Sequence, residues 1–555
     1  MTLLRKISFL LLVSGLAMGQ ASTPNAAPAD SNSMNELKAL REAIAAQQQQ
    51  LKQQQQRIDE LREQVAAQQK AVSANNGSNV APRLVDATLH STSSASTVPS
   101  TSAPVQEDPK KESPLSFRIG GADFTPGGFV DFENIFRTTN TGNVATTSFG
   151  AIPFSNTVQG HLTEFRSTAQ YSRLSLKTHA KFGANDVTGY VEADFNGNDA
   201  TNVFVTANSH TDRFRLYWLD LKRGKWEFLG GQTWGLQTPN RTGVSPLPSD
   251  LALGYQEDAG VGVGYNYTRA SAFRAAYHFN DQWVWAAEVQ NPQQFVGTGE
   301  VIFPFAFNAQ LGTQFDAANN PGAPNVAPNF LTKIAYDTTG NRHFHLEAGG
   351  LLTTAKATVL PIGGTTFQSR STVGGGFMGA LSFDLFKGSD GKNLKFVSSG
   401  MWGYGVGRYL NGLAPDVVVR PIQTGPATFD ATTSMVHSGD FVGGFELAPN
   451  SKTQFGVYYG GAYAQRNAFP DVTSPLLVKP FIGFGGINSP NSANRAIQQG
   501  TLDWTQTFWK HPQYGAVQLI TQTSYLTRSP WFVALGAPKN AHLVMTYVSL
   551  RYVLP

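Results

Sequence analysis

The chain has 555 residues, with 42 Lys or Arg against 38 Asp or Glu, a formal net charge of +4. Removing Arg5 and Lys6 with an N-terminal leader lowers this charge to +2, which is too small to indicate nucleic-acid binding. The absence of cysteine excludes disulfides and thiolate metal sites, while 55 glycines with 11% aromatic and 14% charged residues are atypical of a cytosolic enzyme.

Residues 1–21 are predicted to form a signal peptide. Basic Arg5 and Lys6 precede an apolar run over 7–18, and small Gly19 and Ala21 follow where a peptidase could cut. Beyond this leader, no run reaches the roughly 18 consecutive apolar residues that a membrane-spanning helix needs. We therefore expect any membrane crossing to be made by strands.

Residues 34–72 are predicted to form a coiled coil. Apolar residues recur there every seven positions: Leu37, Ile44, Leu51, Ile58, Val65 and Val72. The second seam is half polar, with Gln47, Gln54 and Gln68 beside two leucines, and such a seam can set the number of chains at a cost in stability. Heptads alone allow a dimer or a trimer, and a disordered Gln-rich segment is the alternative.

Residues 73–116 are predicted to be a disordered linker. They are rich in Ser, Thr, Ala, Pro and Asn and contain few large apolar side chains. Such a segment cannot bury enough surface to offset the loss of chain entropy on folding.

From residue 117 to residue 555 the apolar pattern has a period of two. In 174–182, for example, Leu174, Leu176 and Phe182 alternate with Lys177 and Lys181, so that one face suits lipid and the other suits water. A soluble β-sandwich would alternate in the same way. The spacing of the connections separates the two folds.

Short and long connections alternate along this region without a break. Tight turns are predicted at 183–185, 223–224, 280–282, 339–342, 387–392, 448–451 and 511–514. Long loops are predicted at 137–164, 196–212, 235–269, 291–328, 354–372, 407–436, 464–501 and 527–541. This parity is typical of an all-β transmembrane fold, a 16-stranded antiparallel outer-membrane barrel with both chain ends in the periplasm. Eighteen strands fit equally if 261–269 and 300–310 are strands.

Aromatic residues support this interpretation. The rings expected near strand ends or on outward faces, where they favour the membrane interface, are Trp218, Trp226, Trp283, Trp285, Trp402 and Tyr552.

The order of signal peptide, heptads, linker and barrel, together with the segments 231–234 (GQTW) and 272–277 (AFRAAY), resembles the DcaP-like porins. This resemblance covers nearly the whole chain. It implies a trimer of 16-stranded barrels in the outer membrane, a periplasmic coiled coil, a third loop folded into the pore and a preference for small anions such as dicarboxylates. One departure is the C-terminus, which ends at Pro555 where such chains usually end in an aromatic residue.

Cationic residues on inward faces and on the third loop are the candidates for lining the pore and binding anions. They are Lys177, Lys181, Arg213, Arg215, Arg241 and Arg274. In 213–218, Arg213, Arg215 and Tyr217 are predicted to face inward, with Leu216 and Trp218 outward. An arginine in a water-filled lumen can hold a carboxylate with two parallel hydrogen bonds. Structural ion pairing, for example with acids on the neighbouring strand, is the alternative role.

No enzymatic or metal chemistry is predicted. His343, His345 and Glu347 form an H-x-H-x-E run, but an inward barrel face needs polar residues in any case and no further metal ligand is identifiable. There is no G-x-S-x-G, H-E-x-x-H or phosphate-binding glycine loop, so we expect neither catalytic residues nor a cofactor.

The sequence therefore predicts a porin for passive diffusion of small hydrophilic solutes, biased toward anions, with outer-membrane lipid as a partner. The resemblance adds two further copies of the chain as expected partners. The alternative is a structural anchor whose coiled coil links the outer membrane to the cell-wall layer. A hydrolase lacks a recognisable nucleophile and base, and an energy-coupled transporter lacks a globular plug before the barrel.

Overall fold

Antiparallel strands account for most of the chain from Phe117 onward. The computed structural model describes residues 113–143, 145–197, 210–250, 262–317 and 322–555. The signal peptide, the coiled coil with its six apolar core positions and nearly all of the linker lie outside these residues and stay predictions. In the described ranges, no helix has the length and apolar character needed to cross a membrane.

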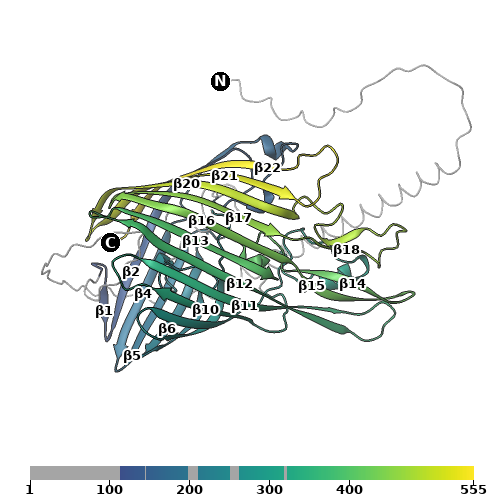
Figure 1. Ribbon diagram of the computed structural model, residues 1–555, viewed down its shortest axis with the longest axis horizontal. Coiled ribbons are helices and arrows are strands. Elements are labelled where there is room, and N and C mark those ends of the chain that lie inside the picture. Colours follow the sequence, from purple (N-terminus) through teal and green to yellow (C-terminus); the bar gives the residue numbers. More distant parts are fainter. Residues whose placement is uncertain (1–112, 144, 198–209, 251–261, 318–321) are drawn as a thin grey trace, which may run out of the picture. The chain divides into compact units, whose positions relative to one another are not determined.

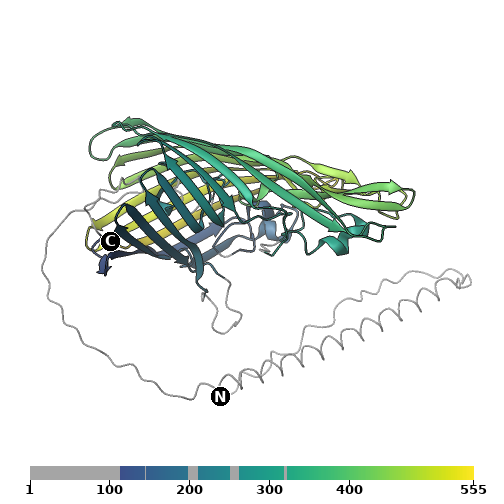
Figure 2. The ribbon, with the colours of Figure 1, turned by 90° about the horizontal axis from the view of Figure 1, so that it is seen from below.

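The strands form one closed sheet in which neighbouring passages through the wall pair with each other and the last passage pairs with the first (Figures 1 and 2). Its first half consists of β2 (Ala122–Arg137), β3 (Glu164–Thr168), β4 (Arg173–Phe182), β5 (Asn185–Asp194), β6 (Arg213–Arg223), β7 (Trp226–Trp234), β8 (Arg269–His278), β9 (Trp283–Gln290) and β10 (Asn329–Asp337). Its second half consists of β11 (Phe344–Val359), β12 (Gln368–Lys387), β13 (Asn393–Tyr404), β16 (His437–Asn450), β17 (Thr453–Ala464), β20 (Asn494–His511), β21 (Gly515–Pro530) and β22 (Ala541–Val553).

The prediction of 16 strands is confirmed. The sheet has 18 strands, but β3 and β4 both pair with β2 and make one passage, and β1 (Phe117–Ile119) only forms a hairpin with the start of β2. The alternative of 18 passages is wrong. Residues 300–310 include the 3-10 helix η5 (Phe305–Phe307) and the start of α2 (Asn308–Leu311), and β8 begins only at Arg269.

The tight turns gather at one end of the barrel and the long loops at the other. The long-loop end carries two hairpins that the sequence pattern missed, β14 (Val417–Gly425) with β15 (Thr428–Met435) and β18 (Asn467–Pro470) with β19 (Phe481–Phe484). Four short 3-10 helices also lie in loops: η1 (Phe149–Ala151), η2 (Val158–His161), η3 (Pro248–Asp250) and η6 (Gly407–Tyr409).

The predicted loop 354–372 is longer than the loop in the structure. Strand β11 continues to Val359 and β12 already begins at Gln368. The extension is stabilised by packing: Ala357 and Val359 are buried together with Val417 and Val419 of β14. The apolar side chains at Ala355 and Ala357 are small, so this face was hidden from a reading based on large residues.

The two faces of the barrel differ as predicted for most strands. Large apolar side chains are exposed on the outside, including the aromatic rings of Trp226, Trp283, Trp402 and Tyr552. Polar and charged side chains are buried on the inside. Closure pairs every strand edge, which a spanning sheet requires because lipid offers no hydrogen bonds.

The predicted alternation in β6 is wrong after Arg215. The register pairs Glu192 with Leu216 and Ala193 with Phe214, so Arg215 is an extra residue in a β-bulge. The bulge turns Leu216 (0% exposed) and Trp218 (6%) inward and Tyr217 (44%) outward. Arg215 keeps its inward position.

The absence of cysteine makes the orientation of the barrel directly testable. Thr365 is exposed in a long-loop-end connection and Ser389 is exposed in a tight turn. If the long loops are extracellular, a membrane-impermeant maleimide should label Thr365→Cys in intact cells and label Ser389→Cys only after lysis. The reverse pattern in a gel-fluorescence assay would contradict the predicted topology.

Candidate functional site

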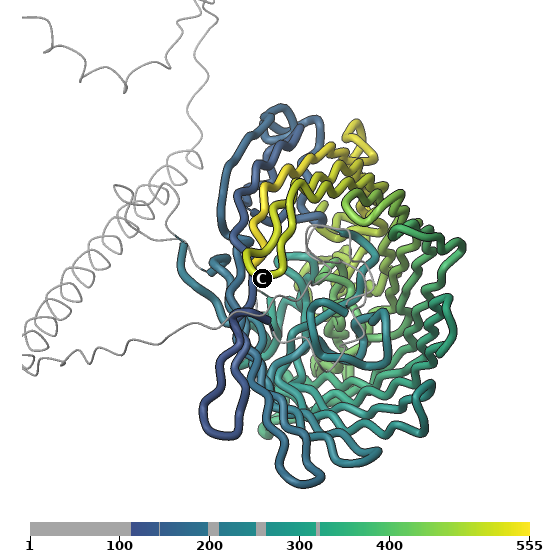
Figure 3. The backbone as a smooth tube through the Cα atoms, turned by 90° about the vertical axis from the view of Figure 1, so that its left-hand side faces the viewer, coloured from purple at the N-terminus to yellow at the C-terminus, as the bar shows by residue number. Residues whose placement is uncertain are grey.

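The described parts of the third long connection, residues 235–250 and 262–268, fold into the barrel. Figure 3 looks along the barrel from the end with the tight turns and shows chain inside the ring of strands. The loop donates hydrogen bonds to side chains on both sides of the interior. The acceptors lie on β9, β10 and β11 near its own root, and on β16 and β20 across the lumen. The loop therefore narrows the lumen.

Arg241 crosses from this loop to the opposite wall. Its Nη1 and Nη2 donate to the two carboxylate oxygens of Glu446 on β16 at 2.8 and 2.7 Å. Tyr458 on β17 donates to the same carboxylate at 2.7 Å. The pair is almost completely buried, with the side chains 2% and 1% exposed. A planar guanidinium that matches a carboxylate in this way fixes position and angle together.

Arg274 on β8 tethers the root of the loop. Its Nε donates to Glu288 at 2.7 Å, while Nη1 and Nη2 donate to the backbone carbonyls of Val244 and Trp234 at 2.9 and 2.8 Å. Glu288 in turn accepts from the backbone N–H of Leu236 at 3.3 Å. These contacts use the guanidinium to hold loop backbone.

A second cluster of charges on β10 and β11 holds the middle of the loop. Lys333 pairs with Glu347 at 3.0 Å and donates to the carbonyl of Thr238 at 2.9 Å. Glu347 also accepts from the backbone N–H of Asn240 at 3.0 Å. Because Lys333 and Glu347 compensate each other, both charges can stay inside the wall while each also holds the loop.

His345 belongs to the same cluster. Its ring nitrogens lie 2.7 Å from Asp337 Oδ1 and 3.1 Å from Glu347 Oε1, and Asp337 accepts from the backbone N–H of Gly243 at 2.9 Å. The H-x-H-x-E run therefore contributes to the anchoring of the loop. Among the described residues, no group of three or more acidic or histidine side chains is arranged to hold a metal ion.

The far part of the loop lies directly on the wall. The backbone N–H of Val263 donates to Gln499 Oε1 on β20 at 2.7 Å. Gly264 has φ +90° and passes so close to β16 that a Cβ there would lie 1.9 Å from the carbonyl oxygen of Phe441. Only glycine permits both this conformation and this approach.

Asp250 lies next to Arg241 in the described part of this loop. Its backbone carbonyl accepts from the Arg241 N–H at 2.8 Å. Burial raises the pKa of the Asp250 carboxyl to about 8, and the nearby acids Glu347 and Asp337 act in the same direction against the opposing charges of His345 and Arg241. At neutral pH this carboxyl is therefore mostly protonated and cancels little positive charge.

The other candidate cations lie on the wall formed by β4, β5 and β6. Arg215 is buried and pairs with Glu192 at 2.7 Å and with Asp194 at 2.8 Å. Arg213 binds Asp194 through both Nε and Nη2, at 3.0 and 2.8 Å, and its side chain is 36% exposed. The acids of β5 thus neutralise much of the positive charge that Arg213 and Arg215 bring to this wall.

The two lysines of β4 differ from each other in environment. Lys181 lies next to a tight turn, is 72% exposed and pairs with Asp186 at 3.3 Å. Lys177 is half-buried opposite Tyr190 of β5. The structure thus separates the six candidates into a β4–β6 group and a group around the third loop, Arg241 and Arg274.

The acids that hold the third loop were missed as site residues. Glu288, Asp337 and Glu446 each lie at an inward position of the period-two pattern, which is the only signal that the sequence offers. Their partners lie up to 205 positions away in the chain, as for Arg241 and Glu446, so local pattern could not identify the pairs.

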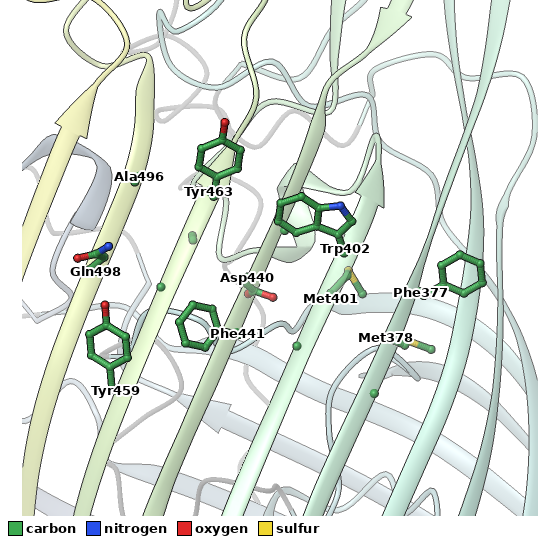
Figure 4. Close-up of a pocket in the computed structure, with 15 residues that line it drawn as sticks. Phe377, Met378, Met401, Trp402, Asp440, Phe441, Tyr459, Tyr463, Ala496 and Gln498 are labelled. Carbon is green, nitrogen blue, oxygen red and sulfur yellow. The ribbon is translucent and has the colours of Figure 1, made fainter.

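A cavity of about 570 Å³ on β12, β13, β16, β17 and β20 lies on the outer face (Figure 4). Its lining includes Gly379, Gly400, Gly439 and Gly461, together with aromatic side chains such as Phe377, Trp402 and Phe441. These rings are among the exposed outward residues of the barrel. The cavity is therefore separate from the lumen.

No protein-family model and no curated protein sequence matches the chain. Among solved structures, the outer membrane channel DcaP of Acinetobacter baumannii matches with a TM-score of 0.51 and 15% identity over 78% of this chain and 98% of that chain. An anion-selective porin from Comamonas acidovorans and OmpF of Salmonella typhi match with TM-scores of 0.40 at 10% identity, over 78% and 79% of this chain and 100% of each of those chains. The chain has the barrel fold of the DcaP channel, and the expected resemblance is confirmed at that level.

The contact between Arg241 and Glu446 predicts the effect of breaking it. Arg241→Met should leave Glu446 buried without its compensating charge, at a cost of about 3–5 kcal/mol, and should release the loop from β16. We expect faster proteolysis within 235–268 while the barrel stays folded. The matched double variant R241M/E446L removes both charges and should recover most of the protection. Equal proteolysis of the single variant and the unmodified protein would show that the pair does not hold the loop.

Proposed function

We propose that this protein is an outer-membrane porin that lets small hydrophilic solutes diffuse passively across the membrane. The observation that carries the proposal is a closed 16-stranded barrel, apolar outside and polar inside, with its third loop held across the lumen by the Arg241–Glu446 pair. A loop fixed in this way would restrict the size of solutes without blocking the channel.

The proposal includes three finer points. The N-terminal segment would lie in the periplasm, because an even number of passages returns both ends of the barrel to the turn side. The heptads at 34–72 would join three copies, although their spacing also allows two. The permeant solutes would be small anions such as dicarboxylates.

The preference for anions would be moderate. Arg215, Arg241 and Arg274 are engaged by carboxylates, so each contributes much less field to the lumen than its formal charge. Arg213 is the more accessible candidate, and the mostly protonated Asp250 removes one negative charge from the loop. Together these features favour a small positive excess at the narrow part of the channel.

Conductance measurements distinguish the proposed porin from the alternative role as a structural anchor. The purified protein should produce stepwise conductance in planar bilayers, and a variant lacking residues 35–72 should conduct equally well per barrel if the heptads only assemble or anchor it. Loss of envelope integrity in cells carrying this deletion would support an additional anchoring role. A folded barrel that gives no conductance steps would overturn the porin.

The raised pKa of Asp250 gives the selectivity a pH dependence. The carboxyl is neutral below its pKa of about 8 and negative above it, so anion preference should fall between pH 6 and pH 9. We expect a change of about 2-fold in the anion-to-cation permeability ratio, because one added charge is partly screened by salt. Reversal potentials in a KCl gradient measure the ratio. In Asp250→Asn this pH-dependent change should be reduced, and an unchanged response would exclude Asp250 as its source.

A further inference from the structure

The outer face of the barrel contains a groove. The cavity of about 570 Å³ in Figure 4 extends over β12, β13, β16, β17 and β20, and we call it the outer groove. A second cavity of about 440 Å³ shares Phe377 and Trp402 with it. Glycines and apolar or aromatic side chains make up most of both linings. The volumes lie within the range of about 300–1,000 Å³ that is typical of ligand sites.

The strand register explains why the groove is there. Phe441 on β16 lies between Gly400 of β13 and Gly461 of β17, and Trp402 lies opposite Gly439. A large ring next to a position without a side chain leaves a hollow beside it. Glycine weakens the interior of a strand and often marks a place that a ligand approaches closely. The groove is thus suited to holding an apolar chain on the lipid-facing side of the wall.

The acidic residue in the lining belongs to the other side of the wall. Asp440 lies between the outward residues Gly439 and Phe441 of β16, and it is only 7% exposed. Its carboxyl therefore does not place a negative charge on the open surface of the groove.

The long-loop edge of the groove is cationic. Tyr463 of β17 and Ala496 of β20 are paired neighbours in the lining and lie at the upper edge of the view in Figure 4. Arg466 follows Tyr463 by three residues, and Arg495 directly precedes Ala496. Both arginines are exposed, and Arg495 is the extra residue of a β-bulge that follows the buried Asn494.

Trp531 brings the two arginines together. The guanidinium of Arg466 lies 4.6 Å from the ring centroid of Trp531, and that of Arg495 lies 5.9 Å from it. The ring itself is fixed, since its Nε1 donates to the carbonyl of Ala464 at 2.9 Å. Within the described part of the chain, neither guanidinium forms an ion pair or a hydrogen bond. Their donors are therefore available to an anion with several oxygens.

Aromatic contacts connect the arginines with the groove. Tyr463 stacks on Trp402 in the lining, with ring centroids 6.1 Å apart and planes 9° from parallel. The edge of the same tyrosine meets Trp531, with centroids 6.2 Å apart. An apolar groove thus leads to two cations over the width of three rings. This order matches a membrane lipid, whose acyl chains lie below its charged headgroup.

We propose that the outer groove and its cationic edge bind a phosphate-bearing lipid of the outer leaflet. An acyl chain would lie in the groove beside Phe441 and Trp402, and the phosphate would accept hydrogen bonds from Arg466 and Arg495. The assignment rests on the proposed outer-membrane location, with the long loops outside, but it does not depend on a conducting lumen.

The test compares two lipids that differ only in phosphate. The full chain in detergent is titrated with diphosphoryl lipid A and with its dephosphorylated form, and retention is measured by native mass spectrometry. We expect about 10-fold tighter retention of the phosphorylated lipid. R466Q/R495Q should lose this difference and retain the dephosphorylated lipid as before. The matched control is R420Q, which alters an exposed arginine stacked on Phe469 at the same end of the barrel and should retain both lipids normally.

A second variant tests the groove itself. In Gly461→Leu the new side chain would fill the groove, and its Cβ would lie 3.3 Å from the ring of Phe441, which can shift. We expect weaker retention of both lipids by about 10-fold, with the preference for phosphate preserved. Bilayer conductance of each variant should match the unmodified protein, which shows that the barrel is intact.

Four outcomes would overturn the proposal. These are equal retention of the two lipids by the unmodified protein, an equal loss in R420Q, and phosphate binding through the two arginines without retention of lipid A. The fourth is a change from oligomer to monomer in G461L with lipid retention unchanged, which would assign the groove to a second copy of the chain. Lipid retention without conductance in the unmodified protein would contradict only the proposed porin.

Discussion

Hydrogen bonding of the backbone is the constraint on which the rest of this structure depends. A strand in lipid has no water to satisfy its N–H and C=O groups, so a spanning sheet has to close, and here β22 pairs with β2 to complete the ring. In a closed sheet, successive residues of a strand alternate between the outward face and the inward face. The outward set is apolar and the inward set polar, and an even number of passages separates short turns from long loops.

The enclosed lumen creates a second problem, which is how to hold a long loop inside it. Apolar packing alone is non-directional, whereas an arginine that binds a carboxylate through two hydrogen bonds defines both distance and angle. The third loop uses this contact with Glu446, and the first loop uses a related one, in which Arg137 binds Glu164 at 3.0 Å and Thr147 at 2.9 Å. Desolvating such pairs is expensive, so their value lies in fixing one arrangement of the loop.

The alternation of outward and inward residues explains what could be predicted from the sequence. The period of two and the spacing of Gly- and Asn-containing turns were sufficient for the architecture and limited the strand count to 16 or 18, because both are local signals. They failed at Arg215, where one extra residue in a bulge reversed Leu216, Tyr217 and Trp218, and no feature of the local sequence marks that position. Within the long loops, β14 and β15 were missed because their stability comes from packing on the extended tips of β11 and β12.

The candidate site shows the same difference between what neighbouring residues in the sequence reveal and what depends on residues far away in the chain. Parity was sufficient to place Arg215 and Arg274 inward, but whether an inward arginine attracts a solute or holds the protein together depends on its partner. Glu288 lies 14 residues from Arg274 on the adjacent strand, and Glu446 lies 205 residues from Arg241. Counting inward cations therefore overstates the positive field of such a lumen. The electric field that a solute meets depends on the charges that are not fully neutralised. Examples are a partly exposed guanidinium such as Arg213, and a buried acid such as Asp250 that remains protonated and so neutralises no cation.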